Sequence, residues 1–155
     1  MTDIQYRAIT EADVPSLFEV RVRTDENRLT SEELAGLGIT ERTVTERLRG
    51  TLAGWLCEDR HRVVGFAMGE ATTGEMWVIA VLPEYCCRGI GSALLRHIET
   101  WLASRGWIRA WLTTDLDPSL RAYSFYRKHG WRDDRIDGGV RYMVKELGKQ
   151  MDGQA

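Results

Sequence analysis

Apolar and polar positions alternate near the start of the chain and then recur with helical spacing. Alternation over residues 4–9 predicts a strand. The following segment predicts a helix, because Thr10 or Asp13 can cap it and apolar side chains then fall on one face. Residues 24–39 are polar and predict a loop or a broken helix, and residues 40–50 predict a short helix that ends at a glycine.

The middle of the chain has the pattern of a β-meander. Three apolar segments, residues 53–58, 62–71 and 75–82, predict successive strands. A charged turn separates the first two segments, and Thr-Thr-Gly separates the second from the third. Strands joined by turns this short pair as antiparallel neighbours, so these three segments are expected to lie side by side in one sheet.

The period of the apolar positions changes after Ser92. Apolar side chains then recur on one helical face until a glycine ends the pattern, which predicts a long helix. Residues 107–114 return to a strand pattern. The Asp-Pro pair at 117–118 is typical of a helix start, and the helix it predicts ends at the next glycine. Residues 131–147 predict a hairpin with Asp-Gly-Gly at its turn.

This order of elements predicts an α+β (mixed α/β) domain around one sheet. The 155 residues, 43% of them hydrophobic, suit one domain over residues 1–148 with a flexible tail over 149–155. The net charge of −2 comes from interleaved acidic and basic residues, so no basic stripe favours a nucleic-acid partner. No apolar run approaches the roughly 20 residues of a membrane helix, and a cytoplasmic location is expected.

The cysteines and histidines predict neither a disulfide framework nor a metal site. Cys57, Cys86 and Cys87 are odd in number, and the chain shows no secretory signal. The three histidines lie far apart in sequence and lack the spacing of metal ligands. No metal is therefore expected.

The segment CCRGIGSALL, which begins at Cys86, lies between a predicted strand and a predicted helix. A helix N-terminus exposes N–H groups and favours anions, and Gly89 and Gly91 let a bulky anion approach the backbone. A phosphate site is favoured, with a simple tight turn as the alternative. A dinucleotide fingerprint needs a small residue where Leu94 stands, and a P-loop needs lysine before Ser92, so NAD and ATP are disfavoured.

This loop and a second motif downstream resemble the GNAT superfamily of N-acyltransferases, which use acetyl-CoA. The family's loop has Gln or Arg, two residues, Gly, one residue, then Gly or Ala; both glycines match, whereas Cys86 departs from the first position. The segment RAYSFYRKHGW is similar to the family's A-x-x-x-Y-x-x-x-G-F signature. The matching positions are Ala122, Tyr126, Gly130 and Trp131. The resemblance covers most of residues 4–147.

The resemblance implies a GNAT-like fold, with a twisted, mostly antiparallel sheet of about seven strands flanked by about four helices. The fourth and fifth strands would splay apart at Val81 and around Thr113, and the pantetheine arm of acetyl-CoA would lie in the gap. Ser119 stands where the family often has Asn. The cofactor-binding residues implied are Ala80, Val81, Cys86, Cys87, Arg88, Gly89, Ile90, Gly91, Ser92, Ser119 and Tyr126.

The resemblance also implies a general base at the start of the fourth strand. Glu75 holds that position, and alternation would place it on the same face as Trp77 and Ile79. A base is needed because a lysine-like amine, with a pKa near ~10.4, attacks only when neutral. The alternative for Glu75 is a solvated strand end, with Glu70 and Glu58 as reserve bases.

Tyr126 and Val81 complete the implied catalytic set. Tyr126 would protonate the departing CoA thiolate; the alternative is a core tyrosine whose hydroxyl binds a neighbouring carbonyl. The N–H of Val81 would bind the thioester carbonyl and its developing oxyanion. Acylation of Cys86 or Cys87 is disfavoured, because both would face the pyrophosphate and no histidine is near them in sequence.

The sequence thus predicts an N-acetyltransferase that moves an acetyl group from acetyl-CoA to a primary amine by direct attack in a ternary complex. The amine belongs to a small molecule or to a protein. The alternative is a sensor domain that binds acyl-CoA or CoA with little or no turnover. A homodimer is expected from the family alone. Acidic residues before and within the predicted helices would favour a cationic acceptor if they face the cleft: Glu26, Glu32, Glu33 and Glu41.

Overall fold

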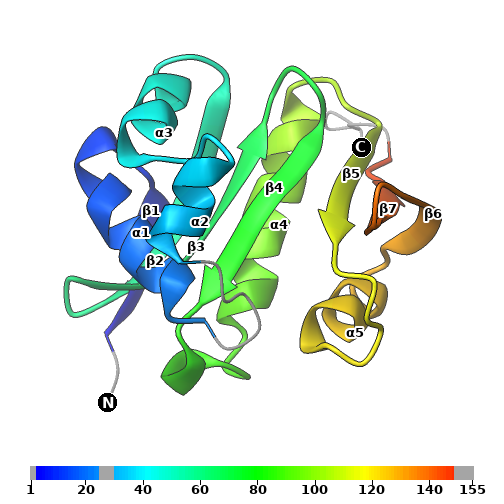
Figure 1. Ribbon diagram of the computed structural model, residues 1–155. Coiled ribbons are helices and arrows are strands. Elements are labelled where there is room, and N and C mark those ends of the chain that lie inside the picture. Colours follow the sequence, from blue (N-terminus) through cyan, green and yellow to red (C-terminus); the bar gives the residue numbers. More distant parts are fainter. Residues whose placement is uncertain (1–2, 25–29, 149–155) are drawn as a thin grey trace.

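The computed structural model describes residues 3–24 and 30–148 (Figure 1). Every strand of these residues joins one seven-stranded sheet, in the order β1-β2-β3-β4-β5-β7-β6. The strands are β1 Ile4–Ala8, β2 Leu52–Asp59, β3 Arg62–Glu70, β4 Glu75–Val81, β5 Arg109–Thr114, β6 Arg132–Asp137 and β7 Val140–Glu146. The helices are α1 Val14–Val22, α2 Ser31–Gly36, α3 Glu41–Leu48, α4 Ile90–Ser104 and α5 Arg121–Lys128, with 3₁₀ turns at Glu11–Asp13 and Pro83–Tyr85.

Neighbouring strands of the sheet run antiparallel except at one place. The exception is the pair of β4 and β5, which are parallel and are connected through α4. A parallel pair needs such a crossover, whereas the short turns between β2, β3 and β4 produce antiparallel pairs. The predicted meander is therefore confirmed, and so is a mostly antiparallel sheet.

The sheet opens between β4 and β5. Their only register pair is Glu75 with Trp111, next to a hydrogen bond of 3.2 Å from the Trp111 N–H to the Gly74 carbonyl. The two strands start side by side and then diverge toward Val81 and Thr114 (Figure 1). The splay predicted between the fourth and fifth strands is confirmed.

Helices cover both faces of the sheet. The first face carries α1 and α3, and the second carries α4, which packs against β2, β3 and β4 (Figure 1). Gly69 lets α4 approach closely, because a Cβ at this position would lie 3.0 Å from Ile98 and 3.2 Å from Trp101. No helix within residues 3–24 and 30–148 is long and apolar enough to cross a membrane.

The sheet ends on one side at β6, an exposed and highly charged strand. All six of its residues are exposed, and five of them are charged. Ion pairs connect it to β7, including Arg132 with Glu146 at 3.1 Å and Asp133 with Arg141 at 2.9 Å. The predicted hairpin is confirmed, with Gly138 at its turn in a left-handed conformation, φ 61°.

Two helices begin at places that the sequence pattern does not fix. The helix predicted from the Asp-Pro pair begins only at Arg121. The Asp117 carboxylate accepts hydrogen bonds from the backbone N–H and the hydroxyl of Ser119, and so forms a separate turn before the helix. In the predicted loop or broken helix, Thr30 and Glu33 form a capping box that starts the short helix α2.

Candidate functional site

A β-bulge in β4 decides which of its side chains share a face. Met68 pairs with Val78, yet Gly69 pairs with Met76, so Trp77 is an extra residue without a partner on β3. An extra residue of this kind reverses the alternation of side chains beyond it. The strand therefore presents different side chains to the two faces of the sheet than simple alternation predicts.

The bulge places Glu75 on the α1–α3 face. Glu75 pairs with Glu70, which accepts a hydrogen bond of 3.2 Å from Arg47 of α3. Trp77 shares this face, whereas Ile79 lies on the α4 face with Gly69. The prediction that Glu75, Trp77 and Ile79 share one face is therefore wrong for Ile79.

The backbone of β4 presents two peptide groups to the open gap. The Leu82 N–H donates to the Val64 carbonyl at 2.9 Å. In an antiparallel pair every second residue bonds to the partner strand, so Ile79 and Val81 direct their N–H and C=O groups away from β3. Beyond Glu75 no register pair to β5 uses these groups. Ala80, by contrast, bonds to β3 through its backbone, so the cleft-facing backbone is that of Ile79 and Val81.

The loop between β4 and α4 holds a row of free backbone donors. Gly89 caps α4 with φ 82°, and Cys87 also has a positive φ of 66°. No backbone hydrogen bond within the described ranges uses the N–H groups from Cys87 through Ser92. The Cys86 N–H instead donates to the Pro83 carbonyl at 3.2 Å, so Cys86 adds no free backbone donor. The helix dipole of α4 favours an anion at this loop.

Side chains around the loop add specific contacts. Arg88 lies over the ring of Tyr85 at 4.9 Å. The Ser92 hydroxyl lies 2.8 Å from Nε2 of His129, and His129 Nδ1 lies 2.9 Å from the Phe125 carbonyl. Because a carbonyl only accepts, Nδ1 carries a hydrogen and donates to Phe125, which leaves Nε2 to pair with the Ser92 hydroxyl. Sequence reasoning gave His129 no role, since nothing in the sequence pairs it with Ser92.

Replacing Gly89 with Val is expected to weaken CoA binding about tenfold. A left-handed conformation costs an L-residue about 1–2 kcal/mol, and β-branching adds to the strain, so the loop leaves the conformation that directs its N–H groups outward. The dissociation constant is measured by isothermal titration calorimetry. Gly106→Val is the matched control, because Gly106 also has a positive φ and open space but lies beyond the opposite end of α4. Equal affinities for both variants would contradict a role for the loop conformation.

Glu75 differs from the two reserve bases, Glu70 and Glu58, in the partners of its carboxylate. Burial raises the pKa of Glu75, Arg47 opposes that rise, and Glu70 adds to it. No residue of the described ranges donates a hydrogen bond to Glu75. Glu70 is also buried, but hydrogen bonds from Thr51, Thr72 and Arg47 outweigh the burial and lower its pKa to about 2. Glu58 forms an ion pair with Arg7 at 3.0 Å. Glu75 is thus the carboxylate best suited to accept a proton.

Tyr126 has a buried ring and an uncommitted hydroxyl. Its ring packs near Phe125 and Trp131, with centroid distances of 5.5 and 6.2 Å. Burial raises the pKa of the phenol. Among the described residues the hydroxyl has no hydrogen-bond partner, so it does not bind a neighbouring carbonyl as a purely structural tyrosine would.

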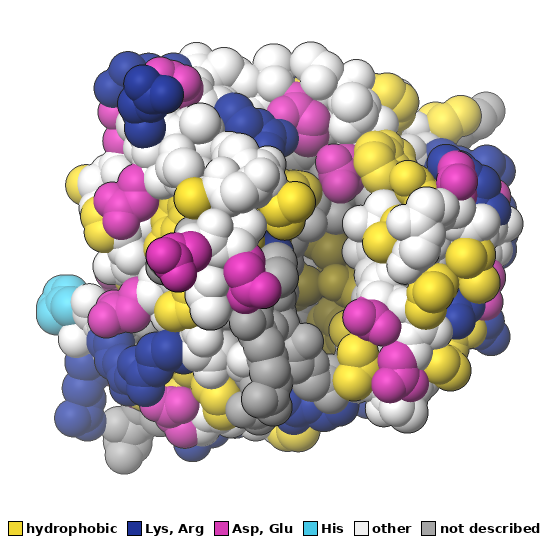
Figure 2. Space-filling view, in the orientation of Figure 1, with side chains coloured by type: hydrophobic (Ala, Val, Ile, Leu, Met, Phe, Trp, Pro, Cys, Tyr) yellow, Lys and Arg dark blue, Asp and Glu magenta, His cyan; other side chains and the backbone are white. Residues whose placement is uncertain are grey.

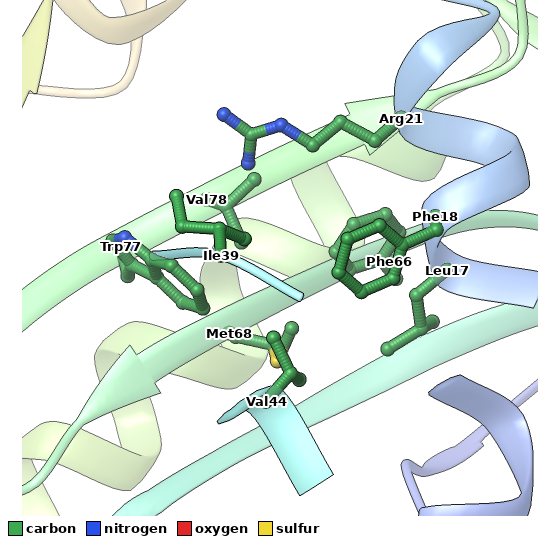
Figure 3. A pocket seen from close by; sticks show the side chains of 9 residues that line it. All are labelled: Leu17, Phe18, Arg21, Ile39, Val44, Phe66, Met68, Trp77 and Val78. Carbon is green, nitrogen blue, oxygen red and sulfur yellow. The ribbon is translucent and has the colours of Figure 1, made fainter. Parts of the chain in front are cut away.

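A shallow apolar hollow, open to solvent, lies on the α1–α3 side of β4 (Figure 3). Its walls come from α1, α3, β3, β4 and the segment between α2 and α3. The described residues that line it are Leu17, Phe18, Arg21, Ile39, Val44, Phe66, Met68, Trp77 and Val78. Figure 2 shows a groove on this side of the molecule, with apolar side chains on its floor and acidic side chains on both rims.

The described cysteines, histidines and carboxylates form no metal-binding cluster. Within residues 3–24 and 30–148, no group of three such side chains lies close enough to hold an ion. Cys57 is buried, and burial raises the pKa of its thiol to about 11. Cys86 and Cys87 lie in the glycine loop, beyond the carboxyl end of β4, while Glu75 lies at the opposite end of that strand.

The sequence profile of the acetyltransferase (GNAT) family matches residues 14–131. The chain belongs to this family. As a GNAT acetyltransferase the protein is an acyltransferase, and its family uses acetyl-CoA as the acetyl donor. The match includes the glycine loop, the bulged strand and the helix of Tyr126, so the predicted membership is confirmed. No curated protein matches the sequence.

Solved structures share the fold of this GNAT acetyltransferase. PaiA N-acetyltransferase from Thermoplasma acidophilum, solved with coenzyme A, has 21% identity and a TM-score of 0.80, with 93% of this chain and 99% of that one covered. The ribosomal-protein-S18-alanine N-acetyltransferase of Escherichia coli has 18% identity and a TM-score of 0.75, covering 97% and 98%. Ard1 from Thermoplasma volcanium has 16% identity and a TM-score of 0.74, covering 94% and 99%. The predicted GNAT-like fold is therefore confirmed.

Proposed function

We propose that the protein transfers an acetyl group from acetyl-CoA to a primary amine by direct attack within a ternary complex. The observation that carries this proposal is the alignment of three features along β4: the free donors of the glycine loop, the two cleft-facing peptide groups, and the partly buried Glu75. A donor and an acceptor that meet on this strand react without a covalent enzyme intermediate.

The residues of the chain fit acetyl-CoA from end to end. The N–H groups from Cys87 through Ser92 would hold the pyrophosphate, and Gly89, with no atom within 4 Å of a Cβ, leaves room for it. The peptide groups of Ile79 and Val81 would bind the pantetheine amides, as a neighbouring strand does. Bound there, the thioester supplies an activated acetyl group. One of these N–H groups, assigned to Val81, would hold the carbonyl as charge develops on it.

Two side chains would move the protons. Glu75 would accept a proton from the acceptor amine, directly or through water, because its pKa is raised and no hydrogen bond occupies its carboxylate. Tyr126 would donate its proton to the departing sulfur, whose thiol has a pKa near ~8.5 by comparison with cysteine. Cys86 and Cys87 lie at the far end of β4, which favours direct attack over acylation of a cysteine.

Thermal unfolding with acetyl-CoA, CoA, NAD and ATP in parallel tests the proposal. A ligand at about 100 times its dissociation constant adds roughly 2.7 kcal/mol to the free energy of unfolding. A stabilisation by acetyl-CoA and CoA alone is expected, followed by acetyl-CoA consumption in the presence of primary amines. Binding without turnover across a broad amine panel would instead support the sensor alternative, and no stabilisation by either CoA species would contradict both.

A further inference from the structure

We propose that His129 is a positioning residue for the pyrophosphate of CoA, and that its imidazole, when protonated on both nitrogens, makes the Ser92 hydroxyl a donor to that anion. This inference rests on the proposed function, which places the pyrophosphate at the glycine loop. It adds a coupling between cofactor binding and proton uptake. Three observations carry it: the fixed hydrogen on Nδ1 of His129, the position of Ser92 in α4, and the two helix ends that meet at this pair.

One hydrogen of the His129 ring is fixed by the backbone. Nδ1 lies 2.9 Å from the Phe125 carbonyl, which only accepts, so Nδ1 carries a hydrogen whether the ring is neutral or cationic. The Phe125 ring packs beside the imidazole, with 4.6 Å between the ring centroids. The proton that can come and go is therefore the one on Nε2, and Nε2 lies 2.8 Å from the Ser92 hydroxyl.

The proton on Nε2 decides what the Ser92 hydroxyl can do. A hydroxyl has one hydrogen to donate and two lone pairs that accept. When the ring is neutral, Nε2 accepts, so the hydroxyl hydrogen is committed to His129 and only lone pairs remain to face a phosphate oxygen. When the ring is cationic, Nε2 donates to Oγ and the hydroxyl hydrogen can turn toward the anion. The second state binds pyrophosphate better, because hydrogen bonds to an ionised acceptor are the stronger ones.

Ser92 is placed to reach the anion. It is the third residue of α4, and its N–H belongs to the row of free donors that begins at Cys87. Side chains of an α-helix tilt toward its N-terminus, so Oγ is directed to the end where those donors are exposed. Ser92 is half-buried, which leaves part of it open to a ligand. A Cβ at Gly91 would lie 3.4 Å from the Phe125 ring, so α5 packs directly against this loop.

The two helix ends act in opposite directions on a cationic His129. The residue directly follows α5, and the dipole at the C-terminal end of a helix favours a positive charge. Ser92 lies at the N-terminal end of α4, where the dipole opposes a positive charge. A pyrophosphate bound at the glycine loop would offset the dipole of α4. The anion therefore favours the second proton, and by reciprocity the second proton favours the anion.

The other ionisable side chains around the pair supply no counterion. Lys145 of β7 pairs with Glu99 of α4 at 2.9 Å, and Glu99 also accepts from the Trp131 indole at 3.0 Å. Among the described residues, the hydrogen-bond partners of the His129 ring are Ser92 and Phe125, so no carboxylate bonds to it. The remaining ionisable groups next to the pair in sequence are Cys87, Arg88, Arg96, Arg127 and Lys128. The basic ones oppose a further positive charge, which leaves the bound anion as its counterion.

The pH dependence of cofactor binding tests this coupling. The probe is 3′-dephospho-CoA, which keeps the pyrophosphate and lacks the phosphate monoester of CoA, a group that itself titrates near pH ~6. Its dissociation constant is expected to rise at least about fivefold between about pH 6 and pH 8, where histidine commonly loses its proton. Calorimetry in buffers of different ionisation enthalpy is expected to show net proton uptake on binding. A dissociation constant that does not change with pH would overturn the inference.

Two variants distinguish this relay from a merely structural role of the histidine. His129→Gln offers an amide N–H to Ser92 at every pH and does not titrate, so the pH dependence of binding is expected to disappear. Ser92→Ala removes the hydroxyl through which His129 acts, and the pH dependence is expected to disappear there as well. Persistence of the full pH dependence in either variant would overturn the inference.

His97→Gln is the matched control for the histidine variant. His97 lies on the same helix as Ser92, but its ring stacks on Trp55 of β2 at 5.5 Å. The same change at this position is expected to keep both the pH dependence and the proton uptake. Loss of both in His97→Gln as well would overturn the assignment to His129.

The outcomes separate this inference from the proposed function. If CoA binds and primary amines are acetylated, but binding does not depend on pH, the coupling fails and acetyl transfer stands. If neither CoA nor 3′-dephospho-CoA binds at any pH, the proposed function fails and the coupling fails with it.

Discussion

Glu75→Gln is expected to lower kcat by about 10²–10⁴-fold and to leave the affinity for CoA unchanged. An amide of the same shape cannot accept the proton of the acceptor amine, and proton transfer by a positioned side chain contributes a factor of this size. The proposed pantetheine site uses the peptide groups of Ile79 and Val81, on the far side of the bulge, so the donor is still expected to bind. Steady-state kinetics and calorimetry measure the two quantities.

The pH dependence of the rate tests whether the Glu75 carboxylate is the base. Burial raises the pKa of Glu75 above the ordinary value of about 4.3, and a base works only when deprotonated. The rate of the unmodified enzyme is therefore expected to rise with pH through that raised pKa, and Glu75→Gln is expected to lose this limb. Glu46→Gln, the same change at an exposed position of α3, is the control. An unchanged pH profile in Glu75→Gln would assign the base to water.

Tyr126→Phe is expected to lower kcat and kcat/KM together, by about 10²-fold. Burial raises the pKa of this phenol, so it stays protonated through the neutral range and can donate to the departing thiolate. The ring remains between Phe125 and Trp131, and the fold is expected to persist because only an unpartnered hydroxyl is removed. Kinetics and thermal unfolding measure both effects.

Tyr123 provides a matched comparison one turn earlier on α5. Its hydroxyl donates to Asp133 at 3.1 Å, away from the groove of β4, so Tyr123→Phe is expected to retain full kcat. If the two phenylalanine variants lost activity equally, the effect would belong to the packing of α5 and Tyr126 would not be the proton donor.

The order of elements could be predicted from the sequence because apolar periodicity records which face of each element is buried. The glycine loop was predictable because glycine tolerates a positive φ and lets a ligand approach the backbone. Gly89 has both the positive φ and the open space. The bulge at Trp77 was not predictable. The bulge depends on how β4 pairs with β3 in three dimensions. The residues before and after Trp77 are apolar, so the sequence pattern does not reveal the change of face.

Contacts between distant segments account for the other differences. The Asp-Pro pair resembles a helix start, and the Asp117 carboxylate does accept from the Ser119 N–H, but Leu120 is extended, with ψ 148°, so the helix begins only at Arg121. Ser92 lies in α4 and His129 directly follows α5, and only the packing of the two segments brings the side chains to 2.8 Å. The apolar hollow beside β4 likewise combines residues of two helices and two strands. The tail and Glu26 lie outside the described residues.

The charged strand β6 has a consequence for contact between copies of the chain. A free strand edge invites another strand to continue the sheet, but a chain that added itself here would have to dehydrate five charges within six residues. The ion pairs that Arg132 and Asp133 already make with β7 would compete with any such partner. Growth of the sheet by strand addition is therefore disfavoured at this end, and the outer edge of β6 is expected to stay exposed to solvent.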